Sequence, residues 1–555
     1  MLFYKFELML FPRVKKLTTT QPDKPQGNLK RWADTFSAGL RLKLASMTNK
    51  WRLALLVFTI VYAAFLLLNL GYMSFQWDEM PHMNGGLLLS RGETGQYLTI
   101  YGYYPPVYDI ATTAFYHLFG VSAASGRLAA VTFSLLAIWI VFEFANRTYG
   151  PRTALLSSGL LGTMPGFFWL SRVAMLETML IFFFSLTLFF FLTWLNNKKD
   201  RTLVLSALAL GVGILAKYQI LVAGLAMIVG ILLWGRKKLK WRFAKFLLIP
   251  LIAALVVVPW LVVLYHAGGM NNFGKLLYTI SEGHEERLEY SARFPLPVFY
   301  LIEMTWPFSD IPVHPISLPI YILGLLGLGL LAWRRKTEDK FFLAWFAVVY
   351  VFFTLIPNKQ WRYIVPVFPT LAISAAAFVI FIYDKAAATW KRQQISLTRK
   401  RMLKVAAGLF VVLTATAVVY SSYEAYEMTA RDQIHIPVEE ATSYAVSHME
   451  TNESIVVLLP FNMLNQDMVW FYLPADRAGQ TQVLQYPELA IDAFTLDFNV
   501  TELISLCEQK NVKYVFLYEH ANVMEVYEKL YETGRFTYEH VVGDVPRSIS
   551  ILAFT

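Results

Sequence analysis

Long apolar runs separated by short polar connectors occupy most of the first 420 or so residues of the chain. A helix needs about 20 mainly apolar residues to cross the hydrocarbon core of a bilayer, and somewhat shorter spans occur in bundles. By this measure the pattern predicts eleven membrane-spanning helices, over 51–72, 126–146, 153–170, 178–195, 202–217, 220–234, 244–265, 318–333, 341–356, 362–383 and 403–422. Two longer polar stretches, 71–125 and 266–317, interrupt the series.

The pattern changes after the last predicted span, where strand and helix signals alternate. Short β-branched and aromatic runs predict strands over 454–460, 468–472, 512–518 and 548–554. Amphipathic spacing predicts helices over 437–450, 500–511 and 521–533. We therefore expect a small α/β domain over 423–555, with a stabilising or acceptor-docking role. It follows a transmembrane domain over 51–422 and a basic segment over 1–50.

Composition supports a membrane protein with many spans. Of the 555 residues, 56% are hydrophobic and 16% are charged, and the mean hydropathy is +0.45. Soluble proteins are about 45–50% apolar and about 25% charged. The charges are too few to cover the surfaces of several soluble domains, and the aromatic content of 16% excludes a disordered chain. A single cysteine, Cys507, excludes a disulfide framework and a cysteine-based zinc site.

The charges are distributed unevenly along the chain. There are 49 Lys and Arg against 39 Asp and Glu, a formal net charge of +10. Most of the basic residues lie in the N-terminal segment and in alternate connectors, NRTYGPR, NNKKDR, GRKKLKWR, WRRKTEDK and DKAAATWKRQQISLTRKR. Because cytoplasmic loops are enriched in Lys and Arg, we expect a multi-pass cell-membrane protein with a cytoplasmic N-terminus and an extracytoplasmic C-terminal domain. Basic residues scattered beside membrane lipids predict no nucleic-acid partner.

Acidic residues mark the first predicted outer loop. Its opening sequence, FQWDEMPHMN, places Asp78 and Glu79 a few residues after the first span. Carboxylates close to a bilayer are paired, solvated or functional, because an isolated charge there is costly. His82 follows Asp78 by four residues, so on a helix the two would share a face. A divalent metal is possible at this pair, although two ligands make a weak site.

Basic residues collect at the same predicted side of the membrane. Arg127 begins the second span, Lys217 ends the fifth, and Lys359 and Arg362 lie between the ninth and tenth. Taken singly, each is typical of an interfacial anchor. Together with the carboxylates they suit attack on an anomeric carbon, in which a base takes a proton and cations neutralise a departing phosphate.

The second outer loop adds two more charged residues. Its sequence, SRVAMLETM, carries Arg172 and Glu177 between the third and fourth spans. An intact carboxylate between two very apolar helices indicates a functional group.

Several of these segments together resemble a known family. They are the DE pair, YYPPVYD, LFGVSAASGRLAA, SRVAMLETMLIFF, GILAKYQ and NKQWRYIVPVFP. They resemble the membrane-embedded GT-C glycosyltransferases, and within these the dolichyl-phosphate-mannose–protein mannosyltransferases and the bacterial aminoarabinose transferase of lipid A. The resemblance extends to about residue 383 and leaves out 1–50 and the outer domain.

The resemblance implies a polytopic α-helical fold of the GT-C type and a polyprenyl-phosphate sugar donor used at the outer face. It implies that Asp78 is the general base, that Glu79 completes an acidic pair, and that Glu177 is the acidic residue of the second loop. The basic positions that it implies for the donor phosphate are Arg127, Lys217 and Arg362, and we add Lys359 beside them. Further candidates are His82, Tyr104 and Arg172.

Two departures from the family are visible. Tyr103 and Tyr104 stand where the aminoarabinose branch has a Glu-Lys pair, which argues against the lipid A reaction. The second loop also lacks the Asp-x-Asp with which oligosaccharyltransferases bind a divalent metal.

The sequence predicts an inverting glycosyltransferase, a hexosyl- or pentosyltransferase whose acceptor is a protein, a lipid or a glycan. The alternative is a transporter or flippase of a lipid-linked sugar. Transporters often show internal repeats and ionisable residues at the bilayer midplane. This sequence shows no repeat, and its notable charges lie at span ends on one side, with Glu143 near the opposite end of the second span.

Overall fold

The computed structural model describes residues 50–233, 244–267, 274, 291–306, 314–390, 396–431, 434–488, 498–519 and 523–555. The chain divides into two units after Leu56, and all contacts discussed below lie within the second unit, Val57–Thr555. The predicted basic segment 1–50 falls almost wholly outside the described residues. So do the connector GRKKLKWR and most of the predicted outer loop 266–317.

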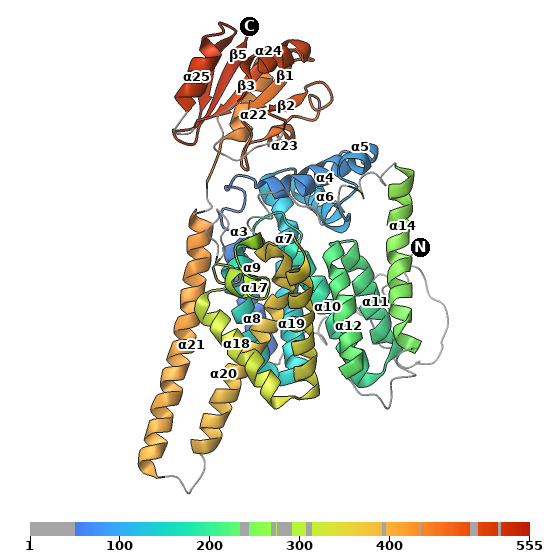
Figure 1. The fold of residues 1–555 in the computed structure, drawn as a ribbon, viewed down its shortest axis with the longest axis vertical. Coiled ribbons are helices and arrows are strands. Elements are labelled where there is room, and N and C mark those ends of the chain that lie inside the picture. The colour runs from blue at the N-terminus through green and yellow to red at the C-terminus, as the bar shows by residue number, and fades with distance from the viewer. Residues whose placement is uncertain are drawn as a thin grey trace, which may run out of the picture. The chain divides into compact units, whose positions relative to one another are not determined.

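Helices coincide with all the predicted spans (Figure 1). They are α3 (Lys50–Leu67), α7 (Ala123–Tyr149), α8 (Pro151–Gly162), α9 (Pro165–Leu170), α10 (Glu177–Asn197), α11 (Asp200–Ile214), α12 (Leu221–Leu233), α14 (Leu248–His266), α18 (Leu318–Arg334), α19 (Thr337–Leu355), α20 (Phe368–Trp390) and α21 (Leu397–Arg431). Among the described residues, six helices are long and apolar enough to cross a membrane, and two shorter apolar ones cover Tyr218–Leu233 and Leu318–Arg334. The predicted class, a polytopic α-helical membrane protein with a small C-terminal α/β domain, is confirmed.

The third predicted span, 153–170, is not one helix but two. Helix α8 ends at Gly162, and α9 begins at Pro165 after Met164 adopts an extended conformation. Proline has no N–H to donate and pushes the residue before it out of the helical region, so the break falls where Pro165 requires it. The short helix α9 leads directly into the second predicted outer loop.

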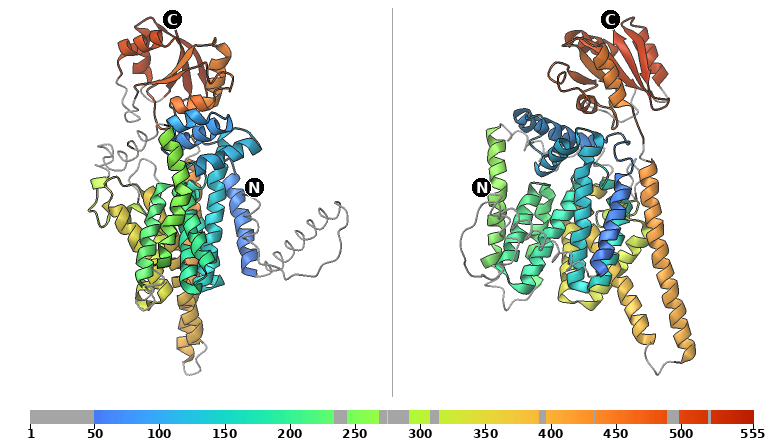
Figure 2. Two further views of the ribbon diagram at one scale, coloured as in Figure 1. Left: turned by 90° about the vertical axis from the view of Figure 1, so that its right-hand side faces the viewer. Right: turned by 180° about the vertical axis from the view of Figure 1, so that it is seen from behind.

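Helix α21 is longer than its predicted span. It has 35 residues and continues past the predicted limit of residue 422 to Arg431. At 1.5 Å per residue it is about 52 Å long, well beyond the thickness of a hydrocarbon core of about 30 Å. Figure 2 shows α20 and α21 side by side, and α21 leads toward the C-terminal domain.

The first predicted outer loop, 71–125, is mostly helical. It contains a 3₁₀ turn, η1 (Trp77–Glu79), and helices α4 (Met80–Ser90), α5 (Thr94–Ile100) and α6 (Val107–Phe119). Helix α6 is amphipathic, with Tyr108, Asp109, Thr112 and Tyr116 buried on one face. Because this face is buried, the first outer loop packs against the rest of the protein.

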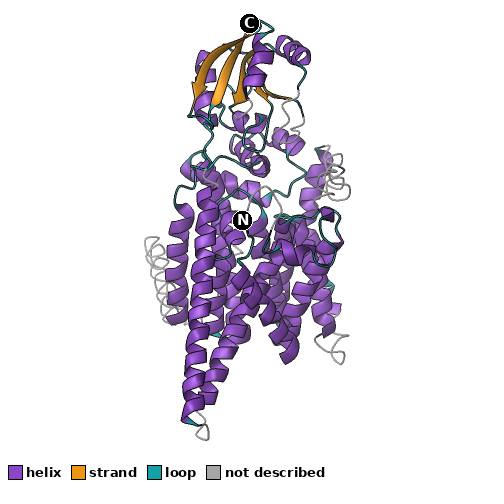
Figure 3. Cartoon of the chain, turned by 60° about the vertical axis from the view of Figure 1, so that its left-hand side comes forward, coloured by secondary structure: helices purple, strands orange, loops and turns teal. Residues whose placement is uncertain are grey.

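The C-terminal domain is a five-stranded sheet with helices around it (Figure 3). The sheet order is β2-β1-β3-β5-β4, parallel across β2, β1 and β3 and antiparallel across β3, β5 and β4. The strands are β1 (Ser454–Leu458), β2 (Val483–Tyr486), β3 (Val512–Tyr518), β4 (Phe536–Val542) and β5 (Ile549–Phe554). The helices are α22 (Val438–His448), α23 (Gln466–Phe471), α24 (Val500–Gln509) and α25 (Val523–Tyr531). Cys507 is buried in the core of this domain.

One expectation for this domain was wrong, and two strands were missed. Residues 468–471 of the predicted strand belong to helix α23, because the Asn465 side chain accepts from the N–H groups of Asp467 and Met468 and so caps a helix. Strands β2 and β4 were not predicted. Both lie at the edges of the sheet, and β4 is mostly exposed, so neither has the continuous apolar run of a central strand.

Candidate active site

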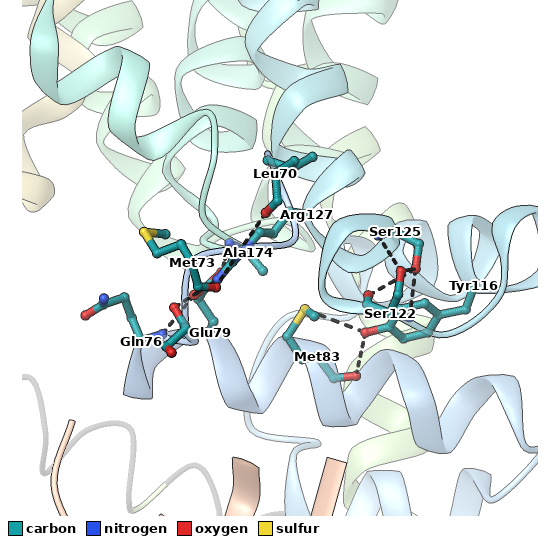
Figure 4. Close-up of polar contacts among 11 residues, drawn as sticks. Leu70, Met73, Gln76, Glu79, Met83, Tyr116, Ser122, Ser125, Arg127 and Ala174 are labelled. Carbon is teal, nitrogen blue, oxygen red and sulfur yellow. Dashed lines mark hydrogen bonds and ion pairs between the residues drawn. The ribbon is translucent and has the colours of Figure 1, made fainter. Parts of the chain in front are cut away.

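A buried ion pair holds the start of the first outer loop (Figure 4). Both oxygens of Glu79 accept hydrogen bonds from Arg127, from Nε and from Nη2, each at 2.9 Å. The other guanidinium N–H groups bond to the backbone carbonyls of Leu70 at 2.8 Å, Met73 at 2.9 Å and Ser74 at 3.2 Å. Both ion-paired side chains are fully buried, and all five guanidinium N–H groups of Arg127 are used.

The Glu79 carboxylate also joins two loops. It accepts from the N–H of Gln76 at 2.8 Å, which closes the η1 turn, and from the N–H of Ala174 in the second outer loop at 2.6 Å. Glu79 thus holds the backbone of both outer loops in one place. The adjacent residue, Asp78, then has its backbone fixed on either side.

The surroundings of Arg127 differ from those expected. The sequence placed it at the outer boundary, where it would contact a lipid phosphate. In the structure its guanidinium lies inside the protein with every donor satisfied, so it offers no free N–H to a phosphate. Through its bonds to Glu79, Arg127 holds the η1 turn in position.

Four other charged side chains form a chain of ion pairs. The Arg362 Nη2 lies 2.5 Å from Asp78 Oδ2, and its Nη1 lies 4.0 Å from Glu177 Oε1. That same Glu177 oxygen is 2.8 Å from Lys217 Nζ. Asp78 is half-exposed, with 51% of its side chain accessible, whereas Glu177 is almost fully buried at 4%. Two carboxylates and two cations therefore alternate from a solvent-exposed oxygen into the protein.

Local structure explains why these residues meet. Asp78 lies on η1, and Glu177 is the first residue of α10, where the positive end of the helix dipole stabilises an anion. Lys217 is extended between α11 and the 3₁₀ turn η2 (Tyr218–Ile220). Arg362 lies on the 3₁₀ helix η4 (Trp361–Val367) that precedes α20, and it also donates to Gln360 Oε1 at 2.9 Å. Each residue is thus at a helix end or in a short turn.

Lys359 and Arg172 have different surroundings. The ammonium of Lys359 is 3.4 Å from the Pro357 carbonyl and 6.0 Å from the Phe299 ring centre, and burial lowers the pKa of this lysine. Arg172 donates to the carbonyls of Phe65 and Leu66, at the end of α3, at 3.1 and 2.7 Å. Burial lowers the pKa of Arg172 to about 10. Arg172 thus serves the C-terminal end of a helix, where unpaired carbonyls attract a cation.

His82 forms a buried cluster with a residue that the sequence reasoning missed. Its Nδ1 is 2.9 Å from Asp109 Oδ1, and the other Asp109 oxygen accepts from the Tyr97 hydroxyl at 2.9 Å. Burial raises the pKa of Asp109, although both hydrogen bonds oppose the rise. The rings of Tyr104 and Tyr108 lie 5.0 and 5.2 Å from that of His82. The signal for Asp109 was its place on the apolar face of α6.

The sequence placed His82 and Asp78 on one face of a helix, but they lie on different elements, His82 on α4 and Asp78 on η1. His82 is instead hydrogen-bonded to Asp109 on α6. Among the described residues, no three His, Cys, Asp or Glu side chains come together in a group that could hold a metal ion.

Known proteins match this chain over part of its length. Residues 104–263 match the family model described as dolichyl-phosphate-mannose-protein mannosyltransferase. An undecaprenyl phosphate-alpha-4-amino-4-deoxy-L-arabinose arabinosyl transferase of Edwardsiella ictaluri is 26% identical over 282 residues, which cover 47% of each chain. The match thus spans about half the length of that curated relative.

Solved structures match over more of the chain. The structure of ArnT from Cupriavidus metallidurans bound to undecaprenyl phosphate is similar over 90% of this chain and 97% of ArnT, with a TM-score of 0.62 and 18% identity. The chain has the GT-C fold. The oligosaccharyltransferase AglB of Archaeoglobus fulgidus, in complex with an inhibitory peptide and a dolichol-phosphate, is similar over 91% of this chain and 74% of AglB, with a TM-score of 0.54 and 13% identity. The resemblance to GT-C glycosyltransferases of the mannosyltransferase and aminoarabinose transferase type is confirmed, and with it a membrane location.

Proposed function

We propose that this GT-C protein is an inverting glycosyltransferase that moves a sugar from a polyprenyl-phosphate donor to an acceptor at the outer face of the membrane. The observation that carries the proposal is the chain of ion pairs from Asp78 through Arg362 and Glu177 to Lys217. It combines an accessible carboxylate with two cations, and it belongs to the outer loops of a fold that similar proteins use with polyprenyl phosphates.

The names of the similar proteins support the choice of donor. ArnT was solved with undecaprenyl phosphate, AglB with a dolichol-phosphate, and the Edwardsiella relative is named for an undecaprenyl-phosphate-linked sugar. An isoprenoid phosphate is the chemistry common to all three. The orientation follows the charge pattern, with the basic connectors in the cytoplasm and the Asp78 loop outside.

Asp78 is proposed to act as the general base. Its carboxylate takes the proton of the acceptor hydroxyl or amine while the acceptor atom donates its electron pair to C1 of the sugar. The bond between C1 and the phosphate oxygen breaks on the opposite side, and its electron pair leaves with the polyprenyl phosphate. The attack from the opposite side inverts the configuration at C1.

Arg362 and Lys217 are proposed to neutralise the departing phosphate. In the structure their charges face Asp78 and Glu177. A phosphate arriving beside Arg362 competes with Asp78 for the guanidinium, whose planar fork matches phosphate oxygens well. That exchange would leave the Asp78 carboxylate free to accept a proton. Glu177 would keep Lys217 and Arg362 in place.

Replacing Lys217 with Gln is expected to weaken donor use. Loss of a charge-assisted hydrogen bond removes about 1.5–3 kcal/mol, which corresponds to a loss of roughly 10- to 150-fold in kcat/KM for the donor. The measurement is steady-state kinetics with varied polyprenyl-phosphate sugar. Lys245→Gln is the matched control, since Lys245 is ion-paired with Asp200 in another part of the chain. Equal kinetics for the two variants would remove Lys217 from the donor site.

The proposed function is tested by following the donor lipid. The purified chain is incubated with a panel of polyprenyl-phosphate sugars and a membrane extract that supplies acceptors, and the lipids are analysed by mass spectrometry. We expect one donor to lose its sugar and to appear as free polyprenyl phosphate. If every donor in the panel keeps its sugar, the proposed function is wrong.

A further inference from the structure

The C-terminal domain touches the loop that carries Asp78. Its leading segment pairs with the chain just before η1: the Ser74 N–H donates to the Ile434 carbonyl at 2.9 Å, and the Ile436 N–H donates to Ser74 Oγ at 2.6 Å. The rings of Tyr72 and His435 stack at 5.0 Å. Both backbone and side chains therefore join the two parts at this point.

Residues of α23 and of the segment just after it add a second area of contact. The Asn84 side-chain amide donates to the Asp467 carbonyl at 3.0 Å, and Arg91 Nη2 donates to the Leu473 carbonyl at 3.2 Å. The rings of Phe75 and Phe471 meet edge to face at 5.0 Å. Helix α4 and the segment before η1 thus contact the C-terminal domain, which also places one of its turns against the residues just before Asp78.

That turn carries Asn462, whose side chain bonds to both residues before Asp78. Its Oδ1 accepts from the Trp77 N–H at 3.0 Å, and its Nδ2 donates to Gln76 Oε1 at 2.8 Å. Two backbone hydrogen bonds between Phe461 and Leu464, at 2.9 and 3.1 Å, close the turn around Asn462. An amide can make this pair of contacts because it carries a donor and an acceptor on one planar group.

We infer that Asn462 is a positioning residue for the proposed base, so that the C-terminal domain completes the active site. The inference rests on the proposed function. Glu79 and Arg127 hold η1 from the protein interior, and Asn462 holds it from the domain side. Asp78 is itself half-exposed, so the direction of its carboxylate depends on the backbone of η1 as well as on its ion pair with Arg362. A misplacement of about 1 Å at a reacting group can lower a rate about 100-fold.

The first test is Asn462→Leu, which keeps the approximate size of the side chain and removes both hydrogen bonds. We expect kcat to fall about 10- to 100-fold, with the KM for the polyprenyl-phosphate sugar unchanged, because Lys217 and Arg362 are untouched. A wild-type kcat in this variant would overturn the inference. Failure of the wild-type chain to transfer sugar would instead refute the proposed function, so the two failures are distinct.

A second variant covers the case in which Asn462→Leu does not fold. In Asn462→Asp the carboxylate still accepts from Trp77, and the Gln76 amide can rotate to donate to it. The new negative charge beside the proposed base raises its pKa, so the rising limb of kcat against pH is expected to move to higher pH. Asn452→Asp is the control. It adds the same charge to the same domain at an exposed position whose left-handed backbone tolerates Asp. Identical pH profiles for the two Asp variants would overturn the inference.

Discussion

Asp78→Asn is expected to reduce sugar transfer by about 10²–10⁴-fold, the usual effect of removing a general base. An amide of the same shape can still accept a hydrogen bond from Arg362, but it cannot take a proton from the acceptor. The fold should survive, because Asp78 is half-exposed, whereas the buried carboxylate of η1 is that of Glu79. The measurement is the initial rate with a radiolabelled polyprenyl-phosphate sugar.

The control for this variant is Asp476→Asn, which changes an exposed carboxylate in the C-terminal domain. It should transfer sugar at the wild-type rate. Donor affinity is a second control. Loss of the Asp78 charge weakens the competition with the donor phosphate for Arg362, so donor binding should be equal or tighter. A rate close to wild type in Asp78→Asn would eliminate Asp78 as the base.

Arg127→Leu is expected to have the largest effect on stability. The substitution leaves the Glu79 carboxylate buried without its cation and removes the donors from the carbonyls of Leu70, Met73 and Ser74. Removing one partner of a buried ion pair destabilises a protein by about 3–5 kcal/mol. The measurement is the thermal unfolding midpoint of the purified protein in detergent, together with its yield from the membrane.

Arg152→Leu is the matched control for that variant. Arg152 pairs with Asp384 at 3.6 Å, and about 60% of each side chain is exposed, so this pair contributes only about 0–1 kcal/mol. A stable Arg127→Leu protein with weakened donor binding would contradict the structural role and restore the phosphate-binding role expected from the sequence.

The sequence predicted that these charged residues lie near one another, but it did not predict which of them form ion pairs. Glu177, Lys217 and Arg362 were expected together because each lies at a span end on the same predicted side. Their pairing depends on the rotation of each helix about its axis, and hydrophobic runs that are apolar all round carry little information about rotation. The 4.0 Å approach of Arg362 to Glu177 could be seen only in the folded chain.

The neighbours Asp78 and Glu79 show most clearly what the sequence could not predict. Asp78 and Glu79 are chemically alike and next to each other, yet one is half-exposed and the other fully buried. The tight 3₁₀ turn points their side chains in different directions. The sequence alone does not indicate which of the two carboxylates faces inward. The prediction for Arg127 failed because its partner Glu79 lies 48 residues away in the chain, and the sequence does not show that the two meet.

Long-range contacts explain the remaining omissions. Asn462 lies 385 residues from Trp77, and an asparagine in a short turn carries no sign of such a partner in the sequence. The short apolar run 468–472 suits a strand or a buried helix equally, and the cap at Asn465 decided between them. Fold class followed from composition and periodicity, which many residues share, whereas the site depends on single contacts.

The central claim, that this chain transfers sugar rather than moving its lipid carrier across the membrane, is tested most directly in proteoliposomes. The purified chain is reconstituted with a radiolabelled polyprenyl-phosphate sugar and acceptor extract, and both the fate of the label and the leaflet of the lipid are measured. We expect the label to leave the lipid for the acceptor, with no exchange of labelled lipid between leaflets, and transfer to stop in Asp78→Asn. Label that remains on the lipid and appears in the opposite leaflet would contradict the account and indicate a flippase.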